Sequence, residues 1–558
     1  MRHDSERSRC SLLLGIAAAL SLSTVAAHGQ VGKIEVANPG MHGDGTMSST
    51  AAAAMGRGTL FLEADIIRKR AVTRAARQSG AWSRRLAPSD LGPVGGHSRS
   101  PRSAPIIVGG QRFAGQTDTT GTPPDTTGAI GPTRFIQLVN RRFGIYNRST
   151  GALINSGTLN TLAGLASSVN SFDPQVIWDP TTRRFYYVMD SIFSSSNNKL
   201  AFGFSRTASP NNGTTDWCHY TYTPNDPARF PDYPKLGDSR FFIIIGVNSF
   251  KASFVGSDLI AIGKPPPGNT CPMEIPKAGS VLNLRDSNNA QVFTPVPANQ
   301  IDHLGAGFVV ARNGGLPSNK LWFFTVRRAS TGFPVFGKAR GVTVPSYTVP
   351  PNANQPTNGS FGYGPLLDTL DARPTQAVQA YNPDRKTYSF WTQHTIQNGS
   401  FAAVRWYEIN PIPATPVVLR TGKVASGSAH LFNAAISPDR QVNGPTRRFG
   451  NSFVVEYNVS SSSIDPRILA GSSFSGGGLS FLLVRNGVDT YRDFSCPSSS
   501  DTLCRWGDYS GATPDPNPPS NRPRTDRGAV WGTNQYSGVA NPPANGTNWR
   551  TWIFNVQP

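Results

Sequence analysis

The sequence predicts an all-β protein: a β-propeller of seven four-stranded blades that follows a signal peptide and a basic arm. Three observations support this fold class. From about residue 105 the chain consists of short β-branched and aromatic runs cut by Gly, Pro, Asn and Asp. This stretch continues to residue 558, which is too long for one β-sandwich. A turn-and-strand unit also recurs along it, as in a repeat architecture.

The first 27 residues have the order of a secretory signal peptide. Three arginines precede an apolar run from Leu12 to Leu22, and small residues follow at positions 25–27. The run is much shorter than the roughly 20 residues that span a bilayer. We therefore expect a secreted protein, extracellular or periplasmic, with no transmembrane anchor; a cytosolic protein with an apolar start is the alternative.

Residues 28–104 differ in composition from the rest of the chain. Runs of Gly, Ser and Ala surround one possible amphipathic helix, from Leu60 to about Gln78, that is rich in arginine. Such a segment is typical of a solvated basic arm. A pro-segment and an anchor to an anionic surface are the other interpretations.

The repeat becomes visible when the turns are aligned. In the clearest copy, the turn Trp178-Asp-Pro-Thr-Thr-Arg-Arg184 precedes the strand FYYVMDSIF. Proline and aspartate are suited to a tight turn, and the strand is apolar enough to be buried on both faces. The six clear copies begin at Ile130, Trp178, Leu236, Asn382, Ser437 and Asp515, and a weaker unit lies between Val292 and Pro345. Each unit is long enough for four strands, which favours a propeller blade over two β-sandwiches.

A propeller must also close its ring, because an open blade would expose a sheet edge. The last strand, Arg550–Val556, ends almost at the C-terminus. We expect it to pair with a strand from the start of the domain, at Pro105–Phe113. The predicted propeller domain is therefore 105–558.

Four cysteines remain after the signal peptide, which predicts two disulfides in an exported protein. The expected pairs are Cys496 with Cys504 and Cys218 with Cys271. Neither pair has the spacing of a zinc site, so we expect no metal and no cofactor.

The net charge is +20, which favours anionic partners such as acidic glycans. No nucleic-acid-binding signature is present, so we expect no specific nucleic-acid partner. A basic secreted protein without a dedicated anionic ligand is the alternative.

Three segments resemble the blade openings of a group of large secreted bacterial propellers. These segments are PPDTTGAIGPTRFIQLVN (123–140), DYPKLGDSRFFIIIGVNSF (232–250) and RWGDYSGATPDPN (505–517). That group belongs with the sialidase-like, BNR-repeat superfamily, and the resemblance covers about residues 110–558. It implies the fold, but the group is largely uncharacterised, so no activity follows. The S-x-D-x-G-x-x-W box and the Arg-Ile-Pro signature of sialidases are absent; D-P-x-x-R replaces the box.

In a propeller, the inner strands begin at the upper face, and the loops between second and third strands return to it. We therefore expect polar residues at these places to surround the channel mouth. The candidate binding residues are Arg142, Arg312, Arg373, Asp173, Asp232, Asp508 and Asn534. Arginines suit bidentate capture of a sugar carboxylate. Turn capping is the alternative role for the repeated aspartates.

The candidate catalytic residues are Glu456, Tyr457, His394 and Asp125. A sialidase-like reaction would use Tyr457 or Tyr536 as nucleophile, activated by Glu456, with Asp125 or Asp173 as proton donor. A lyase acting on uronates would use Tyr457 or His394 as base.

The leading functional hypothesis is a secreted, monomeric propeller that binds an extracellular glycan or other anionic polymer at its upper face. The sequence does not decide whether it also cleaves that ligand. One alternative is a glycan-active enzyme, either a sialidase-like hydrolase or a uronate lyase. The other is a cell-surface scaffold for protein interactions.

Overall fold

The computed structural model describes residues 32–37 and 107–558, apart from short gaps. The gaps are 119, 195–196, 227, 267, 269, 274, 276, 358–364, 444–446, 494–495, 497–502, 518–524 and 541–546. The expected signal peptide and the helix expected at 60–78 lie outside the described residues. No helix in the described part has the length and apolarity needed to cross a membrane.

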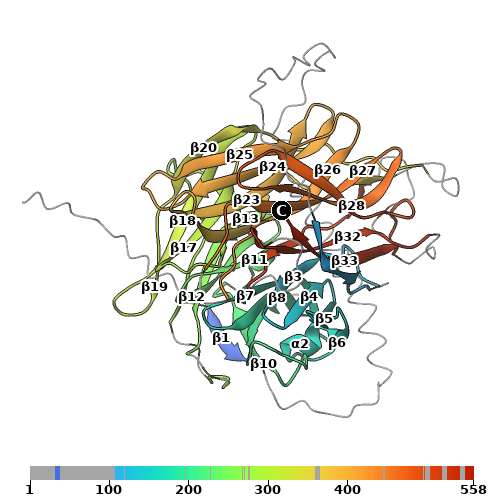
Figure 1. Cartoon of the computed structure of the whole chain (residues 1–558). Coiled ribbons are helices and arrows are strands. Elements are labelled where there is room, and N and C mark those ends of the chain that lie inside the picture. The colour runs from blue at the N-terminus through green and yellow to red at the C-terminus, as the bar shows by residue number, and fades with distance from the viewer. Residues whose placement is uncertain are drawn as a thin grey trace, which may run out of the picture.

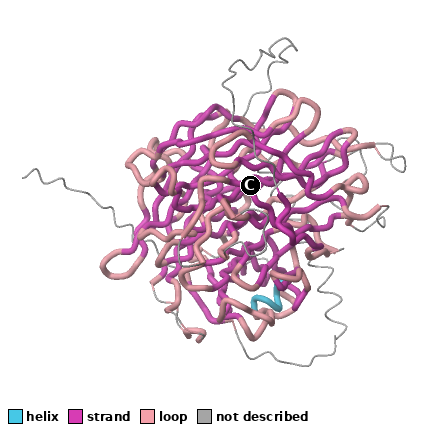
Figure 2. The backbone as a smooth tube through the Cα atoms, in the orientation of Figure 1, coloured by secondary structure: helices cyan, strands magenta, loops and turns pink. Residues whose placement is uncertain are grey.

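The chain forms a seven-bladed β-propeller, as predicted. The blades follow one another around a common axis, as the colour sequence in Figure 1 shows, and strands account for almost all the regular structure in Figure 2. Each blade is an antiparallel sheet whose strands run in sequence order from the axis outward, except that β1 and β2 are the outermost strands of blades 2 and 7. The weaker unit expected between Val292 and Pro345 is the fourth blade.

The first three blades contain β3 to β14. Blade 1 comprises β3 (Thr127–Ile130), β4 (Arg134–Val139), β5 (Arg142–Asn147) and β6 (Leu153–Thr158), followed by the short helix α2 (Leu159–Ala163). Blade 2 comprises β7 (Asn170–Asp179), β8 (Arg184–Ser194), β9 (Asn197–Ser205) and β10 (Trp217–Thr223). Blade 3 comprises β11 (Phe230–Asp238), β12 (Phe242–Phe250), β13 (Phe254–Gly263) and β14 (Ala278–Val281).

Blades 4 and 5 are linked by a short parallel pairing. Blade 4 comprises β15 (Val292–Pro297), β17 (Ala306–Asn313), β18 (Ser318–Arg328) and the outer strands β19 (Pro334–Phe336) and β20 (Arg340–Tyr347), which both pair with β18. Blade 5 comprises β22 (Pro374–Asn382), β23 (Thr387–Asn398), β24 (Phe401–Asn410) and β25 (Val417–Val424). The linking strand is β16 (Asn299–Gln300), which pairs with β22.

The last two blades complete the ring. Blade 6 comprises β26 (His430–Pro438), β27 (Phe453–Ser461), β28 (Ile464–Ser473) and β29 (Leu479–Arg485). Blade 7 comprises β31 (Gly511–Pro514), β32 (Val530–Ser537), β33 (Trp549–Gln557) and β2 (Ile107–Ala114). A separate two-residue pairing joins β21 (Leu366–Leu367) to β30 (Leu503–Cys504).

The strand β2 closes the ring. It pairs antiparallel with β33, with Ile107 opposite Gln557 and Ala114 opposite Trp552. In Figure 1 this blue strand lies beside the red strands of blade 7. The first strand of the propeller is thus the outermost strand of its last blade, which confirms the predicted closure.

The antiparallel order fixes which connections share a face. Turns between the first and second strands of a blade, and between the third and fourth, lie at one end of every blade, which we call the lower face. The other connections lie at the upper face. The recurring turn motif therefore lies on the lower face: Asp179 ends β7 and Arg184 begins β8, for example.

The disulfides Cys218–Cys271 and Cys496–Cys504 both form, as predicted.

Part of the segment assigned to the basic arm belongs to the propeller. Strand β1 (Lys33–Val36) is a fifth strand of blade 2, paired antiparallel with β10. Its side chains alternate, so Ile34 and Val36 pack against the core between blades 2 and 3.

Removal of β2 is expected to destabilise the whole ring. A chain beginning at residue 115 would leave the edge of β33 unpaired, whereas a chain beginning at residue 105 keeps the closing strand. The shorter chain should therefore have a lower Tm and should aggregate, as measured by thermal unfolding with light scattering. Equal Tm values for the two chains would show that closure by β2 is dispensable.

Candidate functional site

The inner strands bend near the upper face, where one residue takes a left-handed backbone conformation. The φ angles are 45° at Asp125, 52° at Asp173 and 46° at Asn433. At Asp173 and Asn433 the strand pairing also shifts register, which marks a bulge. Aspartate and asparagine tolerate this conformation better than most residues. The bulge thus explains why aspartate and asparagine recur at this position.

A segment before β31 crosses the channel axis. We call residues 505–510 (Arg-Trp-Gly-Asp-Tyr-Ser) the axial plug. Trp506 is fully buried and donates a hydrogen bond from Nε1 to Asn458 Oδ1 (2.8 Å). Gly507 has φ 140°, and a Cβ at this position would lie 2.3 Å from the Gln535 amide nitrogen. The plug therefore requires glycine here.

The axial plug binds three blades at once. The Asp508 amide donates to the Asp125 carboxylate of blade 1 (2.7 Å), and its carbonyl accepts from the Tyr233 hydroxyl of blade 3 (2.9 Å). The Tyr509 hydroxyl donates to the Asp173 carboxylate of blade 2 (3.0 Å). All five residues are buried. Asp125, Asp173 and Asp508 were expected at an open channel mouth. They are instead buried together at the axis, which the plug fills.

A buried lysine lies at the centre of these contacts. Lys235 Nζ is 3.5 Å from the ring centre of Tyr509 and 4.1 Å from that of Tyr233, distances typical of cation–π contacts. Burial lowers the pKa of Lys235 well below its ordinary value, while three aspartates of the axis oppose this shift.

Carboxylates on one side of the axis have the spacing of a cation site. Oxygens of Asp173, Asp190 and Asp232 lie within 4.8 Å of one another, and all three residues are buried. Oxygen ligands of this kind suit a hard cation such as Ca²⁺. Asp232, predicted as a binding residue, is therefore placed among carboxylates rather than beside the arginines.

Two of the three predicted arginines bind a protein carboxylate. Arg373 makes a bidentate contact with Asp371, at 2.7 and 2.8 Å. Arg312 Nη2 lies 3.7 Å from the same carboxylate, and both guanidinium groups pack against the ring of Phe293. Asp371 thus occupies the position in which a ligand carboxylate was expected.

Glu456 and Asn534 form part of a buried amide network between blades 6 and 7. The Asn534 side-chain amide donates to Glu456 Oε2 (2.7 Å) and to the Asn433 carbonyl (2.9 Å). Burial raises the pKa of Glu456 well above its ordinary value, which favours the protonated form.

The expected Glu456–Tyr457 pair does not form. Adjacent residues of a strand point to opposite faces of the sheet, and Tyr457 packs in the apolar core between blades 5 and 6. His394 is likewise buried, with its ring nitrogens 2.9 Å from the Ala372 carbonyl and the Tyr407 hydroxyl. Burial lowers the pKa of His394 to about 3. The structure therefore does not bring Glu456, Tyr457, His394 and Asp125 together.

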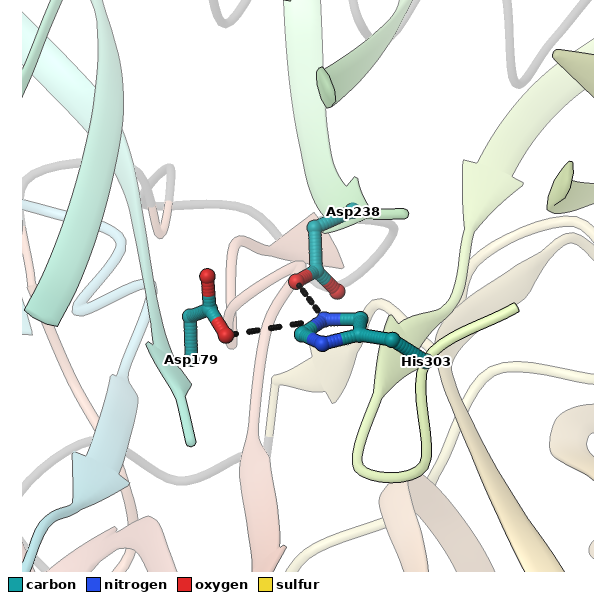
Figure 3. A group of neighbouring side chains, drawn as sticks. All are labelled: Asp179, Asp238 and His303. Carbon is teal, nitrogen blue, oxygen red and sulfur yellow. Dashed lines mark hydrogen bonds and ion pairs between the residues drawn. The ribbon is translucent and has the colours of Figure 1, made fainter. Parts of the chain in front are cut away.

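A second charged cluster lies on the lower face, where the turn motifs of blades 2 and 3 approach blade 4. His303 Nε2 is 2.8 Å from Asp238 and 3.5 Å from Asp179 (Figure 3). The three residues have the spacing of a metal site. Lys264 Nζ, however, lies 2.7 Å from both carboxylates. A protein ammonium group thus supplies the positive charge, and the cluster is a salt bridge between blades.

The third predicted arginine, Arg142, lies apart from the axis. It lines an open groove of about 370 Å³ between the outer strands of blade 7 and blade 1. We call this the closure groove; its lining is Ala114, Gly115, Gln116, Thr117, Arg142, Tyr146, Gly151, Leu153 and Ser156. In the described part of the chain, no residue accepts a hydrogen bond from the Arg142 guanidinium.

Sequence reasoning missed Lys235, Tyr233, Tyr509 and Asp371. The first three lie in the segments DYPKL and RWGDY, in which only Asp232 and Asp508 were singled out as candidate residues. A lysine within an apolar inner strand, with aspartate and tyrosine just before it, was an available signal of a buried charge network. Asp371 follows a loop, and the sequence around it has no recognisable pattern.

Comparisons with known proteins add little beyond the fold. No family model matches the chain, and no curated protein matches it. Similar solved structures include a subtype N10 neuraminidase-like protein of A/little yellow-shouldered bat/Guatemala/060/2010, with a TM-score of 0.36, 6% identity, and 66% of this chain and 99% of that chain covered. An exo-β-1,3-galactanase from Clostridium thermocellum has a TM-score of 0.30 and 10% identity, covering 80% and 99%. A chain from the structure of Drosophila Plexin A in complex with Semaphorin 1b has a TM-score of 0.36 and 8% identity, covering 81% and 88%. Likenesses this distant carry no argument about function.

Replacing Glu456 by glutamine is expected to stabilise the protein at pH 8. The folded-state pKa of Glu456 is raised, so its contribution to the free energy of unfolding is full below the unfolded-state pKa and falls as pH rises. Glutamine stays neutral throughout. E456Q should therefore have a higher Tm than the wild type at pH 8 and a similar Tm at pH 4.

The matched control is Glu408→Gln. Glu408 is also buried, but it accepts hydrogen bonds from Arg420, Ser389 and Asn382. E408Q should lower the Tm at pH 8, because it leaves Arg420 without its carboxylate partner. A loss of stability in E456Q at pH 8 would contradict the raised pKa of Glu456.

Replacing Lys264 by methionine is expected to reduce the free energy of unfolding by about 3–5 kcal/mol, because two buried carboxylates lose their counter-charge. Urea unfolding at pH 7 measures this change. Lys386→Met, at an exposed lysine on the same face, should change stability by less than about 0.5 kcal/mol. Equal effects of the two substitutions would contradict the role given to Lys264.

Proposed function

We propose that this protein is an exported binding protein for an acidic glycan, and that the closure groove holds a carboxylated sugar unit. The observation that carries the proposal is the Arg142 guanidinium, which lines an open groove without a hydrogen-bond acceptor among the described residues. Guanidinium groups bind carboxylates through two parallel hydrogen bonds. The two disulfides suit an oxidising compartment outside the cytosol.

The rest of the groove also suits a sugar. Thr117 and Ser156 contribute hydroxyl groups, and the Gln116 side chain donates to the Tyr146 hydroxyl (2.7 Å). Leu153 is 51% exposed and offers an apolar surface for the C–H face of a sugar ring. A few oriented polar groups beside an apolar platform are typical of small-ligand sites.

Binding without turnover is favoured over the hydrolase and lyase alternatives. The lining of the groove contains no carboxylate, histidine or cysteine, and Tyr146 is its one acid. Burial raises the pKa of Tyr146 to about 12, which makes it a poor general base near neutral pH. Glu456 and His394 are buried elsewhere.

Arg142→Gln is expected to weaken binding of uronate oligosaccharides by about tenfold or more, because a charge-assisted bidentate contact is lost. Calorimetric titration with oligogalacturonate and oligoalginate measures the affinity, and a neutral oligosaccharide of equal length tests the need for the carboxylate. Thermal unfolding shows whether the variant remains folded.

The control is Arg141→Gln, which removes the same charge from the neighbouring residue. The Arg141 guanidinium donates weakly to the Thr120 carbonyl (3.4 Å) and does not line the groove. R141Q should bind as the wild type does. Equal losses in both variants, or no binding of either acidic oligosaccharide, would refute the proposal. Release of unsaturated uronides would show an enzyme.

A further inference from the structure

Three arginines of the turn motif add exposed charge to the lower face. Arg183, Arg240 and Arg385 end the turns of blades 2, 3 and 5, and all three are exposed. The aspartates of the turns in blades 2 and 3 are buried in the cluster around Lys264. In blades 2 and 3 the motif therefore places its aspartate inside the protein and an arginine at the surface.

Between blades 3 and 4, exposed apolar residues lie among these basic residues. In the turn between β18 and β19, Phe333 is 43% exposed and Val335 is 41% exposed. Lys277 Nζ lies 4.4 Å from the centre of the Phe333 ring. Met273, in the adjoining loop of blade 3, is 80% exposed. This turn projects from the edge of the molecule beside the label β19 (Figure 1).

The patch is continuous with the arginines of the turns. The guanidinium groups of Arg240 and Arg328 lie 5.7 and 5.1 Å from the ring of Phe241, which joins the two blades at this point. Arg327, near the end of β18, and Lys338, just after β19, are also exposed. We call the residues Arg240, Lys277, Arg327, Phe333, Val335 and Lys338 the basic hairpin patch.

We infer that the basic hairpin patch docks on an anionic lipid bilayer. Exposed apolar side chains at a turn, bordered by lysine and arginine, can enter the headgroup boundary while the cations attract anionic headgroups. A soluble polyanion would use the basic residues but would leave Phe333 and Val335 in water. The combination of both residue types therefore favours a membrane surface.

Vesicle co-sedimentation with the purified mature chain tests this inference. The vesicles are phosphatidylcholine alone, or phosphatidylcholine with about 30 mol % phosphatidylglycerol. One variant, F333S/V335S, removes the apolar tips. A second, R327Q/K338Q, removes two charges, and the control, R285Q/K423Q, removes two exposed charges from the upper face. Thermal unfolding checks that each variant is folded.

The wild type should bind the anionic vesicles and not the neutral ones, and each patch variant should lose about tenfold in partition coefficient. The control variant and R142Q should bind as the wild type does, which separates this surface from the closure groove. Failure of the wild type to bind, or equal loss in R285Q/K423Q, would overturn the inference. Wild-type binding by F333S/V335S would also overturn it and would indicate a purely electrostatic polyanion site.

Discussion

Closure of the ring by β2 and β33 is the constraint on which the rest of the structure depends. Each blade buries its faces only against its two neighbours, so an opened ring exposes the apolar sides of two blades together. Closure also creates the closure groove. The chain must leave β2 in blade 7 and cross to blade 1, and residues 115–117 of that crossing form one wall of the groove. The candidate binding site is thus a direct consequence of how the ring is sealed.

The axial plug explains why the channel is a poor candidate for the binding site. Burying charges is costly unless each has a partner, and the plug supplies partners from one segment to several blades. Asp508 contacts blades 1 and 3, and Tyr509 contacts blade 2. In these contacts, the polar groups of the axis are hydrogen-bonded to one another. A ligand would have to displace protein contacts to reach them, which makes the outer surfaces the better candidates for a binding site.

The parts of the structure that were predictable from sequence are those encoded by local patterns. The turn motif indicated seven blades, the terminal strand indicated closure, and cysteine spacing indicated both disulfides. The plug was not predictable, because it depends on contacts between residues more than 270 positions apart, such as Tyr233 with Asp508. Pairing Glu456 with Tyr457 conflicted with strand alternation, which was readable from the sequence. Strand β1 was missed because four residues in a polar segment give too little periodicity.

The turn motif links the stability of the fold to the charge of its surface. Aspartate is short, so at the end of an inner strand it reaches backbone amides of its own turn, as Asp179 does at Thr181. The arginine side chain is long and extends from the same turn into solvent, as at Arg183. In blade 6 the arginine instead returns to the protein, and Arg440 binds Asp302 through two hydrogen bonds. Where no acidic partner is within reach, repetition of a structural turn repeats an exposed positive charge. The copies in blades 2, 3 and 5 therefore each add an exposed arginine to the lower face.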